Sequence, residues 1–238
     1  MMLQRCKVSR NNLLVQVFLL MVFLLYPSCG KMNADPSYVG EKVTYLIEPV
    51  GIAEYHDQGV VERDGSELHL TTFRTELLGF RDTEKIYTDP KTRLPVKVER
   101  DLLLWTKKEY LVEEYDQERS CLSVKKYNNK KKVKEYFFKA KGLIHNAVHL
   151  PFFLRDSSDF RIGWSMEASF PREFKIQLVS IEEIQVPAGK FWAYRFTSIP
   201  HKFDIWISRD PPRVPLKIQG MGTLGYTFVM KERQITKD

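Results

Sequence analysis

Apolar and polar residues alternate with a period of two along most of the chain from Gly40 onward. Every second residue is apolar within residues 43–47, 174–178 and 203–207. Residues 192–196 carry aromatic side chains at alternate positions. Successive side chains of a strand point to opposite faces of a sheet, so this period predicts half-buried antiparallel strands.

Turn-forming residues separate the predicted strands at short intervals. They occur at Asp64-Gly65, Asp89-Pro90, Asn128-Asn129, residues 187–189 and residues 210–212. Such residues adopt the backbone conformations of tight turns, so each group predicts a short connection between neighbouring strands. A long antiparallel sheet buries its apolar face only when it curls or closes. The pattern therefore predicts an all-β fold, with a strongly curved antiparallel sheet or barrel-like meander in a single domain over residues 40–238.

One short helix is predicted around residues 143–150, and Pro151 is expected to end it because proline lacks the backbone donor of a helix interior. His145 and His149 are four residues apart and would share one face of this helix. A zinc site needs further ligands, and the sequence names none. We therefore expect a polar face on a partly exposed helix rather than a metal site.

The first thirty residues have the organisation of an export signal. Arg5, Lys7 and Arg10 precede an apolar run over residues 13–26. This run is too short to span a membrane but suits a secretory signal peptide. We assign residues 1–28 to a signal peptide of the lipoprotein type and residues 29–39 to a tether. Cys29 then occupies the position of the acylated cysteine of a bacterial lipoprotein.

Tyr26 and Pro27 depart from the residues that usually precede an acylated cysteine, which keeps two alternatives open. In one, the leader is cleaved nearby, for instance after Gly30; in the other, it remains as an uncleaved anchor. Several acyl chains would hold the protein stably on a membrane, whereas a cleaved chain would diffuse freely. The lipoprotein interpretation predicts an exported, periplasmic protein anchored to the outer membrane through Cys29, since Gly30 rather than aspartate follows the cysteine.

Hydrophobic residues make up 43% of the chain and aromatic residues 13%, a composition typical of a folded domain rich in strands. Without the three basic residues of the leader, 34 basic residues face 30 acidic ones, a net charge of +4. This excess is too small to indicate nucleic-acid binding. With Cys6 in the leader and Cys29 at its end, Cys121 is the one ordinary thiol, and we expect it on a strand without a disulfide partner.

The C-terminal half carries several short motifs in a fixed order. Residues 186–191 are Val-Pro-Ala-Gly-Lys-Phe, residues 206–210 are Trp-Ile-Ser-Arg-Asp, and Pro215 opens the next predicted strand. In these motifs the chain resembles a family of exported bacterial proteins known as domain of unknown function 3108. The resemblance is best over residues 143–230. It implies a shared fold rather than a catalytic apparatus, since the motif residues are those of turns and strand starts.

Aromatic and charged side chains of the predicted sheet form the candidate ligand site. If the strand face that carries Trp206 looks inward together with Trp192 and Tyr194, it would line an aromatic interior suited to an apolar ligand. The alternative is that these residues pack as an ordinary core. Arg155 and Arg209 would either contact an anionic headgroup or take part in a structural salt bridge.

A dense basic group surrounds the Asn128-Asn129 turn at the tip of a predicted hairpin, and it includes Lys130, Lys131 and Lys132. Lysines on an exposed strand discourage pairing between sheets, which is one role for them. The other role is contact with anionic lipid headgroups or an acidic partner.

The motifs do not supply a nucleophile with its base and orienting group, nor a pair of catalytic carboxylates, so we expect neither an enzyme nor a bound cofactor. We expect a cell-envelope protein that binds a lipid-like or apolar ligand within the curved sheet. The alternative is a structural or assembly factor that presents a surface to envelope proteins or to cell-wall polymer. The sequence identifies no particular protein partner.

Overall fold

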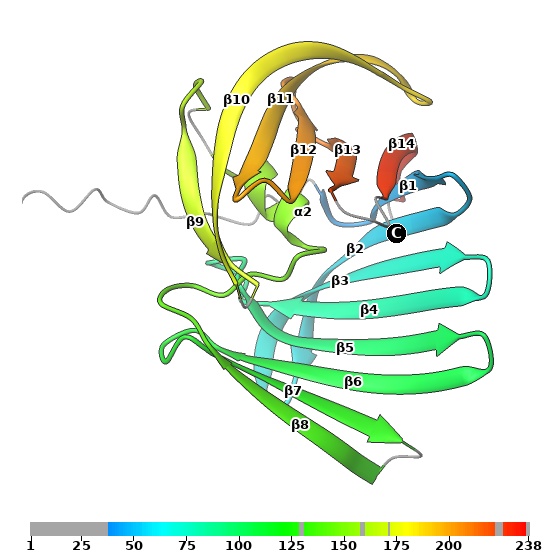
Figure 1. The fold of residues 1–238 in the computed structure, drawn as a ribbon, viewed down its shortest axis with the longest axis vertical. Helices are drawn as coiled ribbons and strands as arrows, with labels where there is room; N and C mark the ends of the chain where they lie inside the picture. The colour runs from blue at the N-terminus through cyan, green and yellow to red at the C-terminus, as the bar shows by residue number, and fades with distance from the viewer. Residues whose placement is uncertain (1–37, 129–130, 158–159, 171, 222–225, 237–238) are drawn as a thin grey trace, which may run out of the picture. The chain divides into compact units, whose positions relative to one another are not determined.

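One antiparallel sheet of 14 strands forms the body of the protein (Figure 1). The computed structural model describes residues 38–128, 131–157, 160–170, 172–221 and 226–236. The predicted signal peptide, Cys29, Lys130 and most of the predicted tether lie outside these residues. The sheet confirms the prediction of an all-β, antiparallel fold.

Consecutive strands pair with each other, except β8 and β9; β1 also pairs with β14, which joins the two meanders β1–β8 and β9–β14. The strands are β1 (Glu41–Glu48), β2 (Ile52–Arg63), β3 (Ser66–Leu77), β4 (Phe80–Thr88), β5 (Pro95–Leu104), β6 (Lys107–Asp116), β7 (Cys121–Asn128), β8 (Lys131–Lys139), β9 (Ser165–Ser169), β10 (Glu173–Val186), β11 (Gly189–Ile199), β12 (Phe203–Ser208), β13 (Pro215–Gly220) and β14 (Thr227–Ile235). Their order in the sheet is β8-β7-β6-β5-β4-β3-β2-β1-β14-β13-β12-β11-β10-β9.

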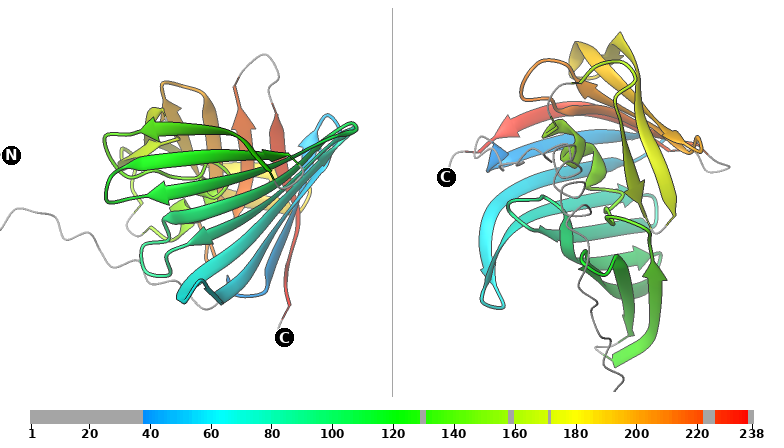
Figure 2. Two further views of the ribbon diagram at one scale, coloured as in Figure 1. Left: turned by 90° about the horizontal axis from the view of Figure 1, so that it is seen from below. Right: turned by 90° about the vertical axis from the view of Figure 1, so that its left-hand side faces the viewer.

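The sheet is strongly curved, and within the described residues its two edge strands, β8 and β9, do not pair with each other. Figure 2 shows the strands wrapping around the short helix α2 (Leu150–Arg155), which lies in the concavity. An isolated parallel bridge between Ile144 and Ser169 ties the segment after β8 to β9. The predicted strongly curved, barrel-like meander is confirmed, and it is an open one.

Several turns in the structure lie at the positions that the sequence predicted. Asp64 and Gly65 join β2 to β3, and both have positive φ (52° and 77°), as a two-residue hairpin turn requires. After β4, the Asp89 carboxylate accepts hydrogen bonds from the backbone N–H groups of Lys91 (3.0 Å) and Thr92 (2.7 Å). Short polar side chains of this kind stabilise turns by bonding to the backbone just ahead of them.

Helix α2 corrects the prediction of a helix over residues 143–150. It begins at Leu150, with Pro151 in its first turn, and residues 143–149 lead into it. Proline is tolerated in a first turn, because its missing N–H would have no intrahelical partner there. Pro151 therefore begins the helix instead of ending it. Within the part of the chain that the structure describes, no helix has the length and apolar character needed to cross a membrane.

Three clusters of buried apolar residues make up the core, and α2 contributes to two of them through Phe152 and through Leu150, Phe153 and Leu154. The Phe152 ring stacks on the Tyr55 ring of β2 at 3.6 Å between centroids. Every strand and core cluster of the described residues lies within residues 38–236, so all of them are contained in the chain from Lys31 to Asp238.

Candidate functional site

The inner face of β4, β5 and β6 carries a cluster of charged side chains. Glu84 pairs across the strands with Phe73, whose ring belongs to the core, so both side chains share the inner face. Arg100 pairs with Glu84 in the ladder, and its guanidinium lies 3.4 Å from the Glu84 carboxylate and 3.7 Å from that of Glu113. The same guanidinium donates a hydrogen bond to Asp82. Three carboxylates therefore surround one cation; we call these four residues the acidic cluster.

Burial governs the electrostatics of the acidic cluster. Glu84 is 4% exposed, and this burial raises the pKa of its carboxyl to about 7, although the nearby Arg100 cation acts in the opposite direction. Glu84 Oε2 and Arg100 Nε are buried, and neither has a hydrogen-bond partner among the described residues. Buried polar atoms are normally satisfied, so these two atoms have unused capacity to bind a further polar group.

A cavity of about 350 Å³ adjoins the acidic cluster on this inner face. Its polar lining consists of Glu84, Arg100, Glu113 and Tyr115, with His145 and Asn146 from the segment before α2. The Tyr115 hydroxyl donates a hydrogen bond to Glu113 at 2.5 Å. Its other walls are mainly apolar and come from β7, β8, the segment that leads into α2 and the residue that follows β9; they include Leu122, Val124, Phe138, Ala147, Val148 and Phe170. The cavity thus has one charged end and a predominantly apolar remainder.

Apolar side chains continue along the inner face beyond the cavity. Leu111 pairs with Arg100, Val124 pairs with Glu113, and Tyr136 of β8 pairs with Val124, so all of them share that face. Tyr136 and Phe138 belong to the edge strand and remain partly exposed. The inner face of β6–β8 therefore carries a partly exposed apolar surface, which ends at the acidic cluster.

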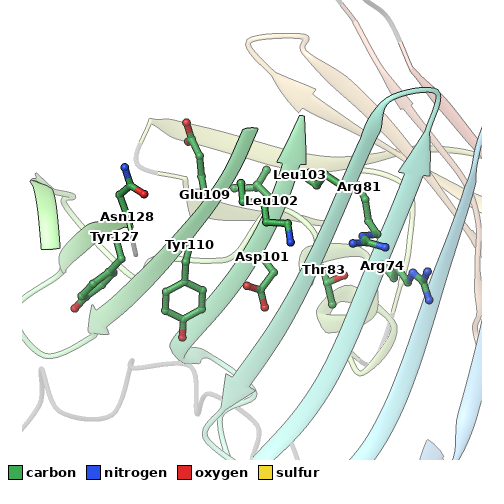
Figure 3. A pocket seen from close by; sticks show the side chains of 11 residues that line it. Arg74, Arg81, Thr83, Asp101, Leu102, Leu103, Glu109, Tyr110, Tyr127 and Asn128 are labelled. Carbon is green, nitrogen blue, oxygen red and sulfur yellow. The ribbon is translucent and has the colours of Figure 1, made fainter. Parts of the chain in front are cut away.

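A larger depression, of about 770 Å³, lies on the opposite face of the same strands. Figure 3 shows Tyr110 and Tyr127 side by side there, on β6 and β7, with Asp101 and Thr83 on the next two strands. The charged side chains around it are largely exposed, and none of its lining atoms is a buried polar group without a partner among the described residues. We therefore regard the inner cavity as the stronger candidate, since its polar groups converge in a buried setting.

The structure does not bring Trp192, Tyr194 and Trp206 together in one cavity. Tyr194 pairs with Ile207 and Arg195 pairs with Trp206, so Tyr194 and Trp206 lie on opposite faces of the sheet. Trp206 is buried and donates a hydrogen bond from its indole N–H to Glu182 at 2.7 Å. The expected shared face was wrong because a shift of one residue in strand register exchanges the two faces, and the sequence alone did not fix this register.

Trp192 and Tyr194 have separate surroundings. Tyr194 packs edge-on against Phe160 in the core, at 5.2 Å between ring centroids. Trp192 is about half exposed and lines a different depression, of about 470 Å³. The Arg209 guanidinium lies over its ring at 5.8 Å. Ligand contact by these residues, and by Arg209, stays a prediction.

Arg155 occupies a structural position in the core. Its guanidinium pairs with the Glu41 carboxylate of β1, and both side chains are fully buried. Arg233 of β14 donates to the other oxygen of Glu41, and the Tyr38 ring covers the Arg155 guanidinium at 3.8 Å. Of the two roles considered for Arg155, the structure shows the salt bridge, with a partner 114 residues away in sequence.

His145 and His149 are buried, which corrects the expectation of a partly exposed polar helix face. His149 occupies the N-cap position of α2, while His145 packs edge-on against Phe153 at 5.0 Å between ring centroids. Burial lowers the pKa of His145 to about 4, because removal from water disfavours the charged imidazolium. Among the described residues, His, Cys, Asp and Glu side chains nowhere gather in threes in the way a metal ion would need.

The remaining predicted residues divide between the described and undescribed parts of the chain. Lys131 and Lys132 begin β8, the edge strand, and both are exposed. Lys130 and Cys29 lie outside the described residues, so the predicted lipidation is not placed. Cys121 begins β7, on a strand as expected, and its side chain is half-buried.

Sequence reasoning missed the acidic cluster, although the signal was present. In β4, Asp82 and Glu84 occur in the same alternating phase as the apolar Ile86, and in β5 Arg100 is in phase with Val98. A charged residue at a position where the period predicts a buried side chain marks a buried polar site.

Comparisons with known proteins bear on the fold alone. No family model matches the chain, so membership of the domain of unknown function 3108 family stays a prediction. No curated protein matches it either. Among solved structures, the chain is similar to a β-barrel-like protein of domain of unknown function DUF1849 from Brucella abortus, with a TM-score of 0.51 and 11% identity over 84% of this chain and 99% of that chain. This likeness shows a shared β-barrel-like fold.

Two further solved structures align over most of the chain but superpose too loosely to carry an argument. One is a protein with a YmcC-like fold from Bacteroides fragilis, at a TM-score of 0.32 and 8% identity over 85% of this chain and 97% of that chain. The other is a protein from Parabacteroides distasonis that is provisionally described as a lipoprotein, at a TM-score of 0.27 and 11% identity over 87% of this chain and 100% of that chain.

Proposed function

We propose that this protein is a non-enzymatic binding protein of the cell envelope that holds an amphipathic, lipid-like molecule on the concave face of its sheet. The observation that carries the proposal is the inner cavity of about 350 Å³, which joins apolar walls to the acidic cluster. Its volume lies within the range of roughly 300–1,000 Å³ that is typical of ligand sites. The export signal in the first thirty residues supports an envelope location, with lipidation of Cys29 as the proposed anchor to the outer membrane.

The apolar part of the ligand would lie against Phe138, Val124 and Val148, and continue along the partly exposed inner face of β6–β8. The head of the ligand would meet the acidic cluster, in which three carboxylates outnumber the single Arg100 cation. This imbalance favours a cationic head, or a neutral one that donates hydrogen bonds, over an anionic head. An ammonium group would supply the missing positive charge and donate a hydrogen bond to Glu84 Oε2, which has no partner among the described residues.

A comparison of two amphiphiles of equal chain length tests the proposal. The chain from Lys31 to Asp238 should bind dodecylamine, which is cationic near neutral pH, more tightly than dodecanoate. Affinity for dodecylamine should rise roughly threefold or more between about pH 6 and about pH 8, because the pKa of Glu84 is near 7 and its ionisation adds a negative charge. Isothermal titration calorimetry at submicellar concentrations measures both effects.

Two variants on adjacent positions of β7 separate cavity binding from surface adsorption. Val124 lines the cavity, whereas Ser123 points to the opposite face of the sheet. Val124→Trp should fill the cavity and weaken dodecylamine binding at least about tenfold, while Ser123→Trp should leave it nearly unchanged. Equal binding by both variants, or tighter binding of dodecanoate, would contradict the proposal.

A specific observation supports the alternative of an assembly factor. Strand β8 is an edge of the sheet, and its Phe137 side chain is 74% exposed on the face opposite the cavity. An edge strand offers unpaired backbone groups to which an extended segment of a partner protein can add as a further strand. If this is the function, Phe137→Lys should abolish capture of an envelope protein and leave dodecylamine binding unchanged.

A further inference from the structure

The connections at one end of the strands expose large apolar side chains. The β1–β2 turn carries Val50, the β3–β4 turn carries Leu78, and the β5–β6 turn carries Trp105, and these side chains are 67%, 84% and 68% exposed. Leu77 and Leu104, next to two of these turns, are also exposed. We call these five residues the apolar rim. In Figure 1 the three turns lie one below another along the right-hand side of the sheet.

Direct contacts join the three turns into one surface. The backbone N–H of Trp105 donates to the carbonyl of Gly79 at 2.6 Å, and the Trp105 ring lies so close over Gly79 that a Cβ there would meet it at 2.8 Å. At Gly51, a Cβ would meet the Leu77 side chain at 2.2 Å. The rim is therefore a continuous ridge, and only glycine at positions 51 and 79 permits this packing.

The backbone at Trp105 is also unusual. Its φ is 55°, in the left-handed region that bulky side chains rarely adopt. A Gly or Asn would fit this turn with less strain, and neither would expose an aromatic ring at its tip. Strain of this kind tends to persist where the strained residue has a role, here an indole held outward at the end of a hairpin.

Basic side chains flank the apolar rim. Lys107 and Lys108 begin β6 after the turn that carries Trp105, Arg81 follows the β3–β4 turn, and Lys131 and Lys132 begin β8 at the same end of the sheet. The Lys107 side chain is 70% exposed. Tryptophan and leucine with neighbouring lysines is the pattern of segments that insert into the headgroup region of a bilayer, where the apolar groups reach the acyl boundary and the lysines stay among anionic phosphates.

We infer that the apolar rim docks the protein on an anionic lipid bilayer, independently of any acyl anchor. A protein partner fits this surface less well, because lysine is depleted at the centre of protein interfaces, whereas anionic headgroups attract it. The apolar groups stand on separate hairpin tips at the same end of their strands, so all of them meet one plane together. The partner is thus a membrane surface that contains anionic lipid.

Vesicle co-sedimentation tests the inference with the chain from Lys31 to Asp238, which lacks Cys29 and its possible acyl chains. It should bind vesicles of phosphatidylcholine with phosphatidylglycerol, and bind vesicles of phosphatidylcholine alone more weakly. Joint substitution of Leu78→Ser and Trp105→Ser should lower partitioning roughly tenfold or more. Lys107→Ala with Lys108→Ala should lower partitioning roughly tenfold onto the anionic vesicles only.

Ile162→Ser provides the matched control, because Ile162 is 65% exposed but lies between α2 and β9, away from the rim. It should bind vesicles as the unaltered chain does. Circular dichroism and thermal unfolding identify any variant that fails to fold. The variant Val50→Trp should tighten vesicle binding, so its result cannot be explained by misfolding. Unchanged binding by the folded rim variant overturns the inference; so does a chain that dimerises through the rim but does not bind anionic vesicles.

Discussion

At the scale of single residues, the most consequential side chain is Glu84. It is an acidic residue on the buried face of a central strand, and burial raises the pKa of its carboxyl to about 7. The Arg100 guanidinium forms an ion pair with Glu84, and it also pairs with Asp82 and Glu113. One guanidinium cannot balance three carboxylates, so ionisation of Glu84 lowers the free energy of unfolding.

This effect gives a pH dependence of stability with a definite sign. The pKa of Glu84 is raised on folding from 4.5 to about 7, so the folded protein holds the proton more tightly than the unfolded chain. The contribution of Glu84 to the free energy of unfolding should therefore fall as the pH rises through this window and level off above it. Glu84→Gln should be more stable than the unaltered chain near pH 8, by roughly 2–3 kcal/mol, with little difference near pH 4.

Urea unfolding of both ligand-free proteins across this pH range measures the difference. Glu54→Gln is the matched control, because Glu54 is exposed on β2, and its effect should stay within about 0.5 kcal/mol at every pH. The account of Glu84 would be wrong if Glu84→Gln and the unaltered chain lost stability in parallel between pH 4 and pH 8.

At the scale of elements, helix α2 organises the interior. It is only six residues long, and every one of them is buried. A helix this short is not stable alone, so its stability comes from packing against the sheet. Arg155 at its end pairs with Glu41 of β1, and Phe152 in its middle stacks on Tyr55 of β2. The helix thus fastens the N-terminal strands to the segment that forms one wall of the cavity.

Phe152→Ala should therefore lower the free energy of unfolding by about 3–5 kcal/mol, since it removes a fully buried ring and leaves a cavity against Tyr55. Phe137→Ala makes the same change on the exposed edge strand and should cost less than about 1 kcal/mol. Chemical denaturation of the two variants makes the comparison. Equal costs would show that α2 does not anchor the fold.

The sequence predicted the individual strands and turns better than it predicted the contacts between them. Alternation identified strands such as β1, β10 and β12, and turn residues placed hairpins such as β2–β3, because both signals are local. The register between β11 and β12 is not local, and the assignment of Trp206 and Tyr194 to one face failed for that reason. Proline is compatible both with the first turn of a helix and with the residue that follows a helix, and its chemistry alone does not distinguish the two. In the structure, Pro151 lies in the first turn of α2.

The candidate site was less accessible to sequence reasoning than the fold. The ion pair between Arg155 and Glu41 joins residues 114 positions apart, which only the tertiary fold brings together. Glu84 and Arg100, by contrast, stand in the buried phase of their strands, so the alternation marked them as buried charges. The sequence did not predict that Ala147 and Val148 pack opposite these strands and form a wall of the cavity.

At the scale of the whole molecule, the fold is an open, curved sheet whose concavity is only partly filled. Helix α2 lies in the concavity (Figures 1 and 2). On the inner face of β5–β8, Val98, Tyr115 and Leu122 are buried in the core, whereas Tyr136 and Phe138 of the edge strand remain partly exposed. A filled barrel would exclude an apolar ligand, whereas an open sheet with a charged end offers an amphiphile both kinds of contact. The apolar rim lies at one end of the same strands, so a bilayer docked there would adjoin the open face.

Native mass spectrometry with lipid extraction, on the full chain expressed with its leader and purified from its own cell envelope, tests the central claim most directly. The account predicts a co-purified amphiphile in a one-to-one complex, which is lost in Val124→Trp and retained in Ser123→Trp. An unliganded mass for the unaltered chain, which stays unchanged after incubation with envelope lipids, would contradict the proposed function and favour the assembly-factor alternative.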